Sequence, residues 1–429
     1  MVGRLRVAGH EAYFAGGCVR DRLLGREPLD WDVATSAPPE TVRRLFRRTV
    51  PVGVQFGVVL VIERGCRFEV ATFRSDEAYV DGRRPSAVHF GTLPDDAARR
   101  DFTINALYED PESGAVHDLV GGVADLRAGV IRAIGDPHAR IAEDRLRMLR
   151  AVRFAARLGF RIDADTRAAI VAAAPTVPDI AAERIGDEIV KLLSEGNARR
   201  GFELLADTTL LDVVLPEVAR MRGVEQSPDF HPEGDVWAHT LLLLDQLPAG
   251  APPALALGAL LHDVGKPLRA GRNGGRITFY GHEAVGAELA VAICQRLRRS
   301  RETWERVEYL VRNHLRLLNA PAMRLATLKK MLAGDGFDEL LRLARLDALA
   351  SSHELRFVLF CERRKDELGA TALRPPRLLG GTDLIAMGYA PGPRLGEILR
   401  AIEDAQLDGT IATREEAQAF VREHCSPTS

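Results

Sequence analysis

Short apolar runs separated by polar turns dominate the first third of the chain. The run AYFAGG (12–17) predicts a strand that ends on glycines, and the following residues predict a short helix over 19–25. WDVAT (31–35) predicts a second strand. Residues 56–64 and 66–74 predict a hairpin, because apolar and polar side chains alternate along the second run. The pattern therefore indicates a small region of mixed α and β structure.

A helical period replaces this alternation from about residue 137. Apolar residues recur every three or four positions over 140–160, which predicts one continuous helix that ends near Gly159. The remainder of the chain also has a helical pattern with Pro and Gly breaks. Further helices are expected over 165–174, 181–195, 198–206, 236–247 and 254–266.

Length and composition limit the class of protein. The chain has 429 residues, enough for two to four domains, and a formal net charge of −2 without a basic tail, which argues weakly against a general nucleic-acid binder. Five scattered cysteines without a CxxC pair exclude a small disulfide scaffold and a thiolate zinc cluster. No uncharged apolar run approaches the ~20 residues that span a bilayer. We therefore expect a soluble, cytoplasmic protein with no membrane partner.

Two aspartates follow a glycine turn near the N-terminus. Gly16 and Gly17 precede a predicted helix that carries Arg20, and Asp30 and Asp32 belong to the next strand. Alternate residues of a strand point to one face, so the two carboxylates would repel each other without a cation between them. Mg²⁺ prefers such oxygen ligands, and glycines let backbone N–H groups approach a triphosphate. A lone DxD is more often a solvated strand end, but this ordered combination favours a metal and nucleotide site.

These motifs resemble the active-site strand–helix–strand of the DNA polymerase β-like nucleotidyltransferases, and more narrowly their class II tRNA nucleotidyltransferase and bacterial poly(A) polymerase branch. The resemblance continues through RRDFTINAL (99–107) and 134–163. It implies two-metal nucleotidyl transfer, with Mg²⁺ on the two aspartates. Glu69 on a neighbouring strand is either a third catalytic carboxylate or an ordinary exposed residue, and both interpretations stay open. The implied metal ligands are Asp30 and Asp32, and the implied nucleotide contacts in the head are Gly16, Gly17, Arg20, Arg100, Asp101 and Asn105.

Asp144 and Arg147 lie three residues apart in the predicted helix and are expected on one face. Their acceptor and donors complement the amino group and ring nitrogen of cytosine and adenine, whereas uracil and guanine reverse that pattern. By spacing alone, an ordinary surface pair worth roughly a few tenths of a kcal/mol is the better interpretation. The position of this pair after the RRDFT motif favours recognition of a nucleotide base instead. The resemblance matches the pair to the family's EDxxR motif and adds Arg150 and Arg153 as nucleotide contacts.

His262 and Asp263 are adjacent in an apolar run, where a polar pair without a partner would be costly to bury. His239 on the preceding predicted helix could face them. This H…HD…D pattern resembles the HD metal-dependent phosphohydrolases and implies a divalent metal of unknown identity. Whether the site hydrolyses a phosphoester or holds a structural metal stays open. The implied ligands are His239, His262, Asp263 and Asp347, with His282 and His314 at accessory positions.

The resemblances imply an α+β fold in which a polymerase β-like head with a small mixed sheet precedes an all-α neck, body, HD domain and tail. We expect addition of CCA to tRNA 3′ ends from CTP and ATP. The alternatives are an A-adding enzyme, a poly(A) polymerase, and an HD-type phosphohydrolase with an RNA-binding head. A homo-oligomer is a further expectation that stays open. The expected boundaries are 1–135 for the head, 136–200 for the neck, 201–230 for the connector, 231–350 for the HD domain and 351–429 for the tail.

Two features favour full CCA addition. Residues 50–63 lack the basic and apolar signature of the poly(A) polymerases in this branch. The loop over 75–91 is complete, whereas enzymes that add only the two cytidines are shortened there. The balanced charge then predicts a local basic track for tRNA with modest, salt-sensitive binding, rather than a general affinity for polyanions.

Overall fold

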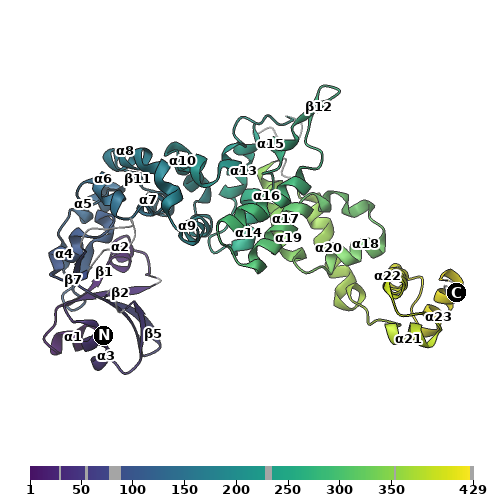
Figure 1. Cartoon of the computed structure of the whole chain (residues 1–429), viewed down its shortest axis with the longest axis horizontal. Coiled ribbons are helices and arrows are strands. Elements are labelled where there is room, and N and C mark those ends of the chain that lie inside the picture. Colours follow the sequence, from purple (N-terminus) through teal and green to yellow (C-terminus); the bar gives the residue numbers. More distant parts are fainter. Residues whose placement is uncertain (29, 54–56, 77–87, 228–233, 352–353, 426–429) are drawn as a thin grey trace. The chain divides into compact units, whose positions relative to one another are not determined.

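The structure is a computed structural model that divides into two compact units (Figure 1). The first contains residues 1–219 with two short segments, 248–250 and 296–298, and the second contains the remaining residues. The five-part division predicted from the sequence is finer and stays a prediction. The structure describes residues 1–425 except residue 29 and the ranges 54–56, 77–87, 228–233 and 352–353.

A seven-stranded mixed sheet with the order β3-β4-β5-β2-β1-β8-β9 lies at the centre of the head. Within the described residues, β2 and β5 pair in parallel and the other neighbours are antiparallel. The expected strands and hairpin correspond to β1, β2, β4 and β5. The elements are α1 (Val2–Val7), β1 (Ala12–Ala15), α2 (Gly17–Leu23), β2 (Trp31–Thr35), α3 (Pro39–Leu45), β3 (Thr49–Gly53), β4 (Val58–Glu63), β5 (Cys66–Thr72), β6 (Arg74–Asp76), β7 (Val88–Phe90), α4 (Leu93–Ala98), η2 (Thr103–Asn105), β8 (Leu107–Glu109), β9 (Val116–Asp118) and α5 (Gly122–Ala128).

The two faces of this sheet have different chemistry. Val33 of β2 and Val70 of β5 share a buried apolar cluster with Val42 of α3, so α1 and α3 cover this face (Figure 1). Because side chains alternate along a strand, Asp32 and Glu69 point to the opposite face, where α2 lies. The alternation of apolar and polar residues along β2 and β5 therefore places both carboxylates on the same side of the sheet.

The single helix predicted over 140–160 is wrong, because it is interrupted after Glu143. Asp144 has an extended backbone conformation (φ −144°, ψ 101°), and its Oδ1 accepts the N–H of Leu146 at 3.1 Å. This local side-chain bond competes with the helical pattern and separates two helices. The elements of this part are β10 (Val130–Ile131), α6 (Pro137–Glu143), α7 (Arg147–Leu158), β11 (Arg161–Ile162), α8 (Ala164–Ala173), η3 (Ala174–Asp179), α9 (Ala182–Ser194), α10 (Ala198–Asp207), α11 (Leu210–Val214) and α12 (Pro216–Ala219).

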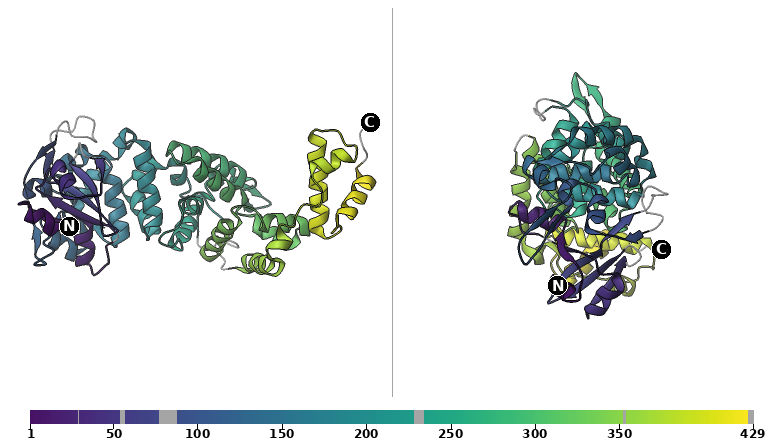
Figure 2. Two further views of the ribbon diagram at one scale, coloured as in Figure 1. Left: turned by 90° about the horizontal axis from the view of Figure 1, so that it is seen from below. Right: turned by 90° about the vertical axis from the view of Figure 1, so that its left-hand side faces the viewer.

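Helices dominate the second unit. The helix predicted over 254–266 ends at Leu261, so His262 and Asp263 lie in the following turn. A short hairpin, β12–β13, was not expected from the helical pattern. The C-terminal helices α22 and α23, in yellow in Figure 2, share one apolar cluster. The elements are α13 (Val236–Asp245), α14 (Pro253–Leu261), α15 (Lys266–Arg269), β12 (Gly271–Asn273), β13 (Arg276–Thr278), α16 (His282–Arg296), α17 (Arg301–Asn313), η4 (Arg316–Ala322), α18 (Leu325–Leu332), α19 (Phe337–Ala350), α20 (Arg356–Leu373), α21 (Gly381–Ala386), α22 (Pro393–Asp408) and α23 (Arg414–His424).

The expected fold class, an α+β head with a small mixed sheet followed by helical domains, is confirmed. Among the described residues, none of the helices combines the length and apolar character needed to cross a membrane.

Candidate active site and metal centre

Three carboxylates gather at the open face of the head sheet. Asp32 and Glu69 occupy paired positions on β2 and β5, and the exposed Asp30 immediately precedes β2. Burial, reinforced by the charge of Glu69 and then of Asp30, raises the pKa of Asp32 to about 6, although Arg100 opposes the shift. Crowded carboxylates with oxygen ligands to offer fit a divalent cation, which would relieve their repulsion.

The glycine turn makes room for a guanidinium. Gly16 has a φ of 74°, a conformation that favours glycine. A Cβ at this position would lie 2.8 Å from Nη1 of Arg100, which donates to the carbonyl oxygen of Asn105 at 3.0 Å. Gly17 opens α2, whose next turn carries Arg20. The turn thus brings the backbone of Gly16 and Gly17 close to the guanidinium groups of Arg20 and Arg100.

A chain of hydrogen bonds links four of the expected nucleotide contacts. Arg20 Nη1 donates to Asn105 Oδ1 at 2.7 Å, and Asn105 Nδ2 donates to Asp101 Oδ1 at 3.0 Å. Arg150 donates through Nε and Nη2 to Asp101 Oδ2 at 2.9 and 2.6 Å. Although burial opposes the charge, Arg150 and the bond from Asn105 lower the pKa of Asp101 to about 2. Asp101 is therefore an ionised anchor between α2 and α7.

Asp96 anchors the arginines of the RRDFT motif and was missed by the sequence reasoning. Its Oδ1 accepts from Arg99 Nε at 2.9 Å, and its Oδ2 accepts from Arg100 Nε and Nη2 at 3.2 and 3.1 Å. The hydroxyl of Tyr108 donates to the same Oδ2 at 2.7 Å. Asp96 lies three and four residues before the two arginines, so helical spacing could have revealed it.

Asp144 and Arg147 do not share a helical face, which corrects the sequence prediction. Asp144 lies at the break between α6 and α7, and its carboxylate is bound by Arg184 of α9, with Nη1 to Oδ1 at 3.0 Å and Nη2 to Oδ2 at 2.8 Å. Arg147 is the first residue of α7. Both nevertheless line the same cavity. Because Arg184 is forty residues from Asp144, no local spacing reveals this contact.

Arg147 is held by acceptors from three places. Its Nη1 donates to Glu143 Oε2 at 2.6 Å and to the carbonyl oxygen of Arg140 at 2.7 Å. Its Nη2 donates to the carbonyl oxygen of Arg99 at 3.1 Å. The guanidinium is thereby fixed against the RRDFT segment.

Further along α7, Arg153 is paired with two carboxylates, Glu188 of α9 and Glu195. It donates to Glu188 Oε2 at 2.6 Å and to Glu195 Oε2 at 2.8 Å. The ring of Phe154 lies under three guanidiniums, with the Cζ atoms of Arg153, Arg150 and Arg20 at 4.4, 5.2 and 5.3 Å from its centroid. This aromatic support holds the cations together at the site.

The sheet carboxylates, the glycine turn, Asp144 and the arginines of α2 and α7 line one cavity of about 930 Å³. Its volume suits a nucleotide-sized ligand. Carboxylates of the sheet contribute metal-binding chemistry, and arginines of α2 and α7 contribute phosphate-binding chemistry. Most of the loop expected over 75–91 lies outside the described residues. The expected head and neck residues that line the cavity are Gly16, Gly17, Arg20, Asp30, Asp32, Glu69, Arg100, Asp101, Asn105, Asp144, Arg147, Arg150 and Arg153.

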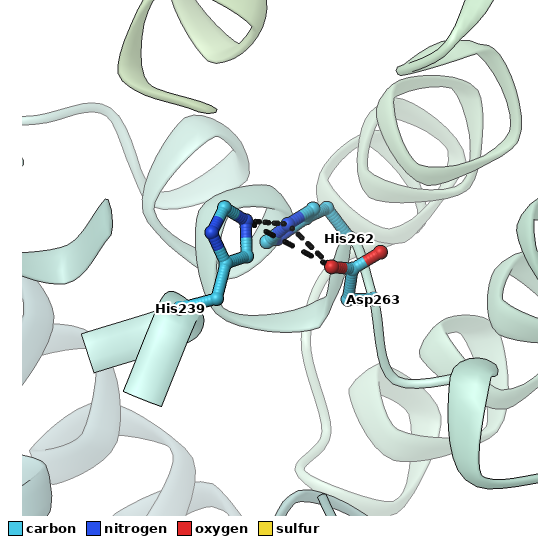
Figure 3. Close-up of side chains that lie close together, drawn as sticks. All are labelled: His239, His262 and Asp263. Carbon is cyan, nitrogen blue, oxygen red and sulfur yellow. Dashed lines mark hydrogen bonds and ion pairs between the residues drawn. The ribbon is translucent and has the colours of Figure 1, made fainter. Parts of the chain in front are cut away.

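The second unit holds a buried cluster of histidines and aspartates. His239 Nε2 lies 3.2 Å from His262 Nε2 and 3.8 Å from Asp263 Oδ2. Figure 3 shows the three side chains directed toward one another. Asp347 Oδ1 lies 3.0 Å from His239 Nε2. The structure thus brings together the four residues that the H…HD…D pattern singled out.

A second set shares Asp263. His282 Nε2 lies 3.3 Å from Asp263 Oδ1, and His314 Nε2 lies 3.8 Å from the same oxygen. The two Nε2 atoms are 3.2 Å apart. Asp263 therefore presents Oδ2 to one pair of histidines and Oδ1 to the other.

The tautomers of these rings fit metal ions. Nδ1 of His262, His282 and His314 lies 2.7–2.9 Å from backbone carbonyl oxygens, so each Nδ1–H donates and each Nε2 carries a lone pair. Burial lowers the pKa of His314 to about 4, which keeps this ring neutral. Two lone pairs that face each other at 3.2 Å repel unless a cation lies between them.

Lys266 and Gln226 border this cluster. Lys266 Nζ donates to Asp263 Oδ2 at 2.7 Å and to Gln226 Oε1 at 2.6 Å. Because an ammonium only donates, this bond fixes the orientation of the amide. Gln226 Nε2 is then a buried donor without a hydrogen-bond partner in the described part of the chain.

Three domain families match the chain in order. The Poly A polymerase head domain matches residues 12–132, the probable RNA and SrmB-binding site of polymerase A matches residues 159–221, and the HD domain matches residues 235–358.

Whole proteins are similar as well. The CCA-adding enzyme of Levilactobacillus brevis is 35% identical over 417 residues, which are 96% of this chain and 93% of that protein. The match to the CCA-adding enzyme of Leuconostoc mesenteroides is 50% identical over 202 residues and spans about half of each protein, 47% and 50%. The crystal structure of the Bacillus stearothermophilus CCA-adding enzyme in complex with CTP superimposes with a TM-score of 0.76 at 28% identity, covering 98% of this chain and 95% of that one.

Proposed function

This chain belongs to the family of CCA-adding enzymes, and we propose that it adds C, C and A in turn to tRNA 3′ ends. The nucleotides come from CTP and ATP, pyrophosphate is released, and no nucleic-acid template is used. One observation carries the proposal: a single cavity gathers the sheet carboxylates, the arginine network and the base-reading pair. Transfer chemistry and base selection can therefore act on the same nucleotide.

Asp30, Asp32 and Glu69 would hold Mg²⁺, because they are the carboxylates that crowd the open face of the sheet. When bound there, Mg²⁺ supplies Lewis-acid activation of the tRNA 3′-hydroxyl and neutralises charge on the departing pyrophosphate. Arg20 and Arg100 hold the triphosphate beside the glycine turn. Their hydrogen bonds to Asn105 and Asp96 fix them before the substrate arrives.

Base selection comes from Asp144 and Arg147. The carboxylate accepts an N–H from the exocyclic amino group of cytosine or adenine, and the guanidinium donates to the adjacent ring nitrogen. Uracil and guanine present an oxygen and an N–H in these places, so both contacts become repulsive. Arg150 and Arg153 of α7 line the same cavity and would contact the nucleotide beside this pair.

The decisive experiment gives the purified protein tRNA that lacks CCA, tRNA ending in C and tRNA ending in CC, each with one labelled nucleotide. Addition of C to the first two and of A to the third supports the proposal. Addition of A to the third substrate alone identifies an A-adding enzyme, and long A tracts identify a poly(A) polymerase. Persistence of addition in Asp30→Ala would refute the assignment of the metal site.

A second function is favoured by the buried cluster of the second unit. We propose that it binds divalent metal at His239, His262, Asp263 and Asp347, extended by His282 and His314, and hydrolyses a phosphoester. Lys266 and the free amide donor of Gln226 supply contacts for phosphoryl oxygens.

This second function is tested with bis-p-nitrophenyl phosphate and a 2′,3′-cyclic nucleotide. Loss of hydrolysis in Asp263→Asn with retention in Asp32→Asn places the activity in this cluster. Metal binding without hydrolysis of either ester instead indicates a structural metal, and loss in Asp32→Asn places the activity in the head.

The proposed partners are the tRNA 3′ end, CTP and ATP, with the cytoplasm as the proposed compartment. The homo-oligomer expected from the sequence stays a prediction, for which sedimentation of the purified protein is the measurement.

A further inference from the structure

Among the described residues, the partners of the Asp144 carboxylate leave one acceptor position open. Oδ1 accepts both the N–H of Leu146 at 3.1 Å and Nη1 of Arg184 at 3.0 Å, which fills its two lone pairs. Oδ2 accepts Nη2 of Arg184 at 2.8 Å and keeps one lone pair. Oδ2 is therefore the atom that an amino group of a nucleobase would meet.

Arg147 keeps two donors beside this acceptor. Three of its five N–H groups are used, two on Nη1 and one on Nη2, by Glu143 and two backbone carbonyls. Within the part of the chain that the structure describes, one N–H on Nη2 and the Nε–H are left for a ligand. Asp144 and Arg147 thus offer an acceptor and donors in a fixed arrangement before any nucleotide binds.

The orientation of the Asp144 carboxylate depends on Arg184. The terminal torsion of an aspartate is broad, so its direction is set by its partners. The bond from Leu146 holds one oxygen, whereas the planar fork of Arg184 holds both and so fixes the carboxylate plane. Arg184 is in the first turn of α9 and is not among the described residues that line the cavity.

We propose that Arg184 is a positioning residue for base selection, acting through Asp144 so that Oδ2 accepts the amino group of CTP or ATP and rejects the oxygen of UTP or GTP. This inference rests on the proposed function, because Asp144 must be a base-reading residue. It assigns part of the nucleotide specificity to α9, through a residue that does not itself line the cavity.

The test compares CMP and UMP incorporation by the full-length protein on tRNA that lacks CCA. Arg184→Gln is expected to lower the ratio of kcat/KM for CTP to that for UTP by about tenfold or more. Arg184→Lys keeps the charge but loses the planar fork, so it should recover only part of the ratio. Arg199→Gln, which removes an exposed ion pair with Glu203 on α10, is the matched control.

A double-mutant cycle separates positioning from a general structural effect. If Arg184 acts through Asp144, Arg184→Gln should not change the CTP to UTP ratio further in an Asp144→Ala background. An undiminished effect in that background, or an unchanged ratio in Arg184→Gln, would overturn the inference. Loss of the proposed function is a distinct outcome, because the unsubstituted protein would then incorporate neither nucleotide. Circular dichroism melting of each variant identifies any that fails to fold, and Arg184→Lys then carries the comparison.

Discussion

Asp32 and Glu69 face the same side of the head sheet from paired positions on two parallel strands. Burial, followed by the charge of Glu69, raises the pKa of Asp32 to about 6. The carboxylates therefore repel one another unless a cation is bound, and they lie where nucleotidyl transfer needs a divalent metal ion.

Removing the Asp32 charge should change the pH dependence of stability. A carboxyl with a folded pKa of about 6 binds more protons in the folded than in the unfolded state between about pH 4 and 6. Its contribution to stability is therefore present at low pH and is lost as the pH rises through this interval, by about 2 kcal/mol. Asp32→Asn should lack this loss in protein treated with a chelator, as measured by chemical unfolding at pH 4.5 and 7.5. Nucleotide addition should fall about a thousandfold. Equal pH dependence in both proteins would contradict the assigned shift.

The ion pair between Arg150 and Asp101 should stabilise the protein in the opposite pH range. Because the folded pKa of Asp101 is lowered to about 2, its contribution is present above the unfolded value near 4 and is lost as the pH falls toward 2. Arg150→Gln should cost about 2 kcal/mol of unfolding free energy at pH 7 and raise KM for both nucleotides. Arg145→Gln removes a weaker and more exposed pair with Asp179 and serves as the control. A similar cost in both variants would argue against the special role of Asp101.

Asp96 should affect catalysis without touching substrate. Asp96→Asn retains shape but loses the charge that holds Arg99 and Arg100, so KM for CTP and ATP should rise about tenfold. Tyr108→Phe removes one hydrogen bond to the same carboxylate and should have a smaller effect, measured by steady-state kinetics. A greater loss in Tyr108→Phe would point to the Tyr108 hydroxyl, which also accepts from Arg100 Nε at 3.0 Å, rather than to the Asp96 charge as the main anchor of the arginines.

Metal content should distinguish the two histidine pairs that share Asp263. His314→Ala should lose one metal equivalent, whereas Asp263→Asn should lose metal from both pairs, because each of its oxygens faces one pair. Atomic emission spectrometry of protein purified with Mn²⁺ or Ni²⁺ gives the stoichiometry. CCA addition should stay within about twofold, since the cluster belongs to the other unit and shares no residue with the head cavity. One equivalent in both the unsubstituted protein and His314→Ala would show a single ion at His239 and His262.

The sequence predicts local geometry well where one element carries the chemistry. The alternation along the strand predicted one face for Asp30 and Asp32; Asp32 lies on β2, whereas Asp30 immediately precedes it, and the pattern left the role of Glu69 open. The H…HD…D pattern named Asp347 although it is far along the chain from Asp263. These features follow from periodicity or from motifs with a chemical constraint.

Tertiary contacts and side-chain competition explain what the sequence did not predict. The helix over 140–160 breaks because Asp144 bonds the backbone of Leu146, an outcome that apolar periodicity does not contain. Arg184 reaches Asp144 only through the packing of α9 beside α7. Asp96 was detectable by its spacing to Arg99 and Arg100, but its burial beside Tyr108 becomes visible only in the folded head.

The parallel pairing of β2 with β5 has a consequence for how the head acquires activity. Residues 36–65, which form α3, β3 and β4, lie between these strands in the sequence. A pairing of this kind requires closure of a long loop and is slow compared with the formation of a hairpin such as β4–β5. The carboxylates therefore meet only after the crossover is complete, so a refolding chain should regain helical signal before it regains the ability to extend tRNA.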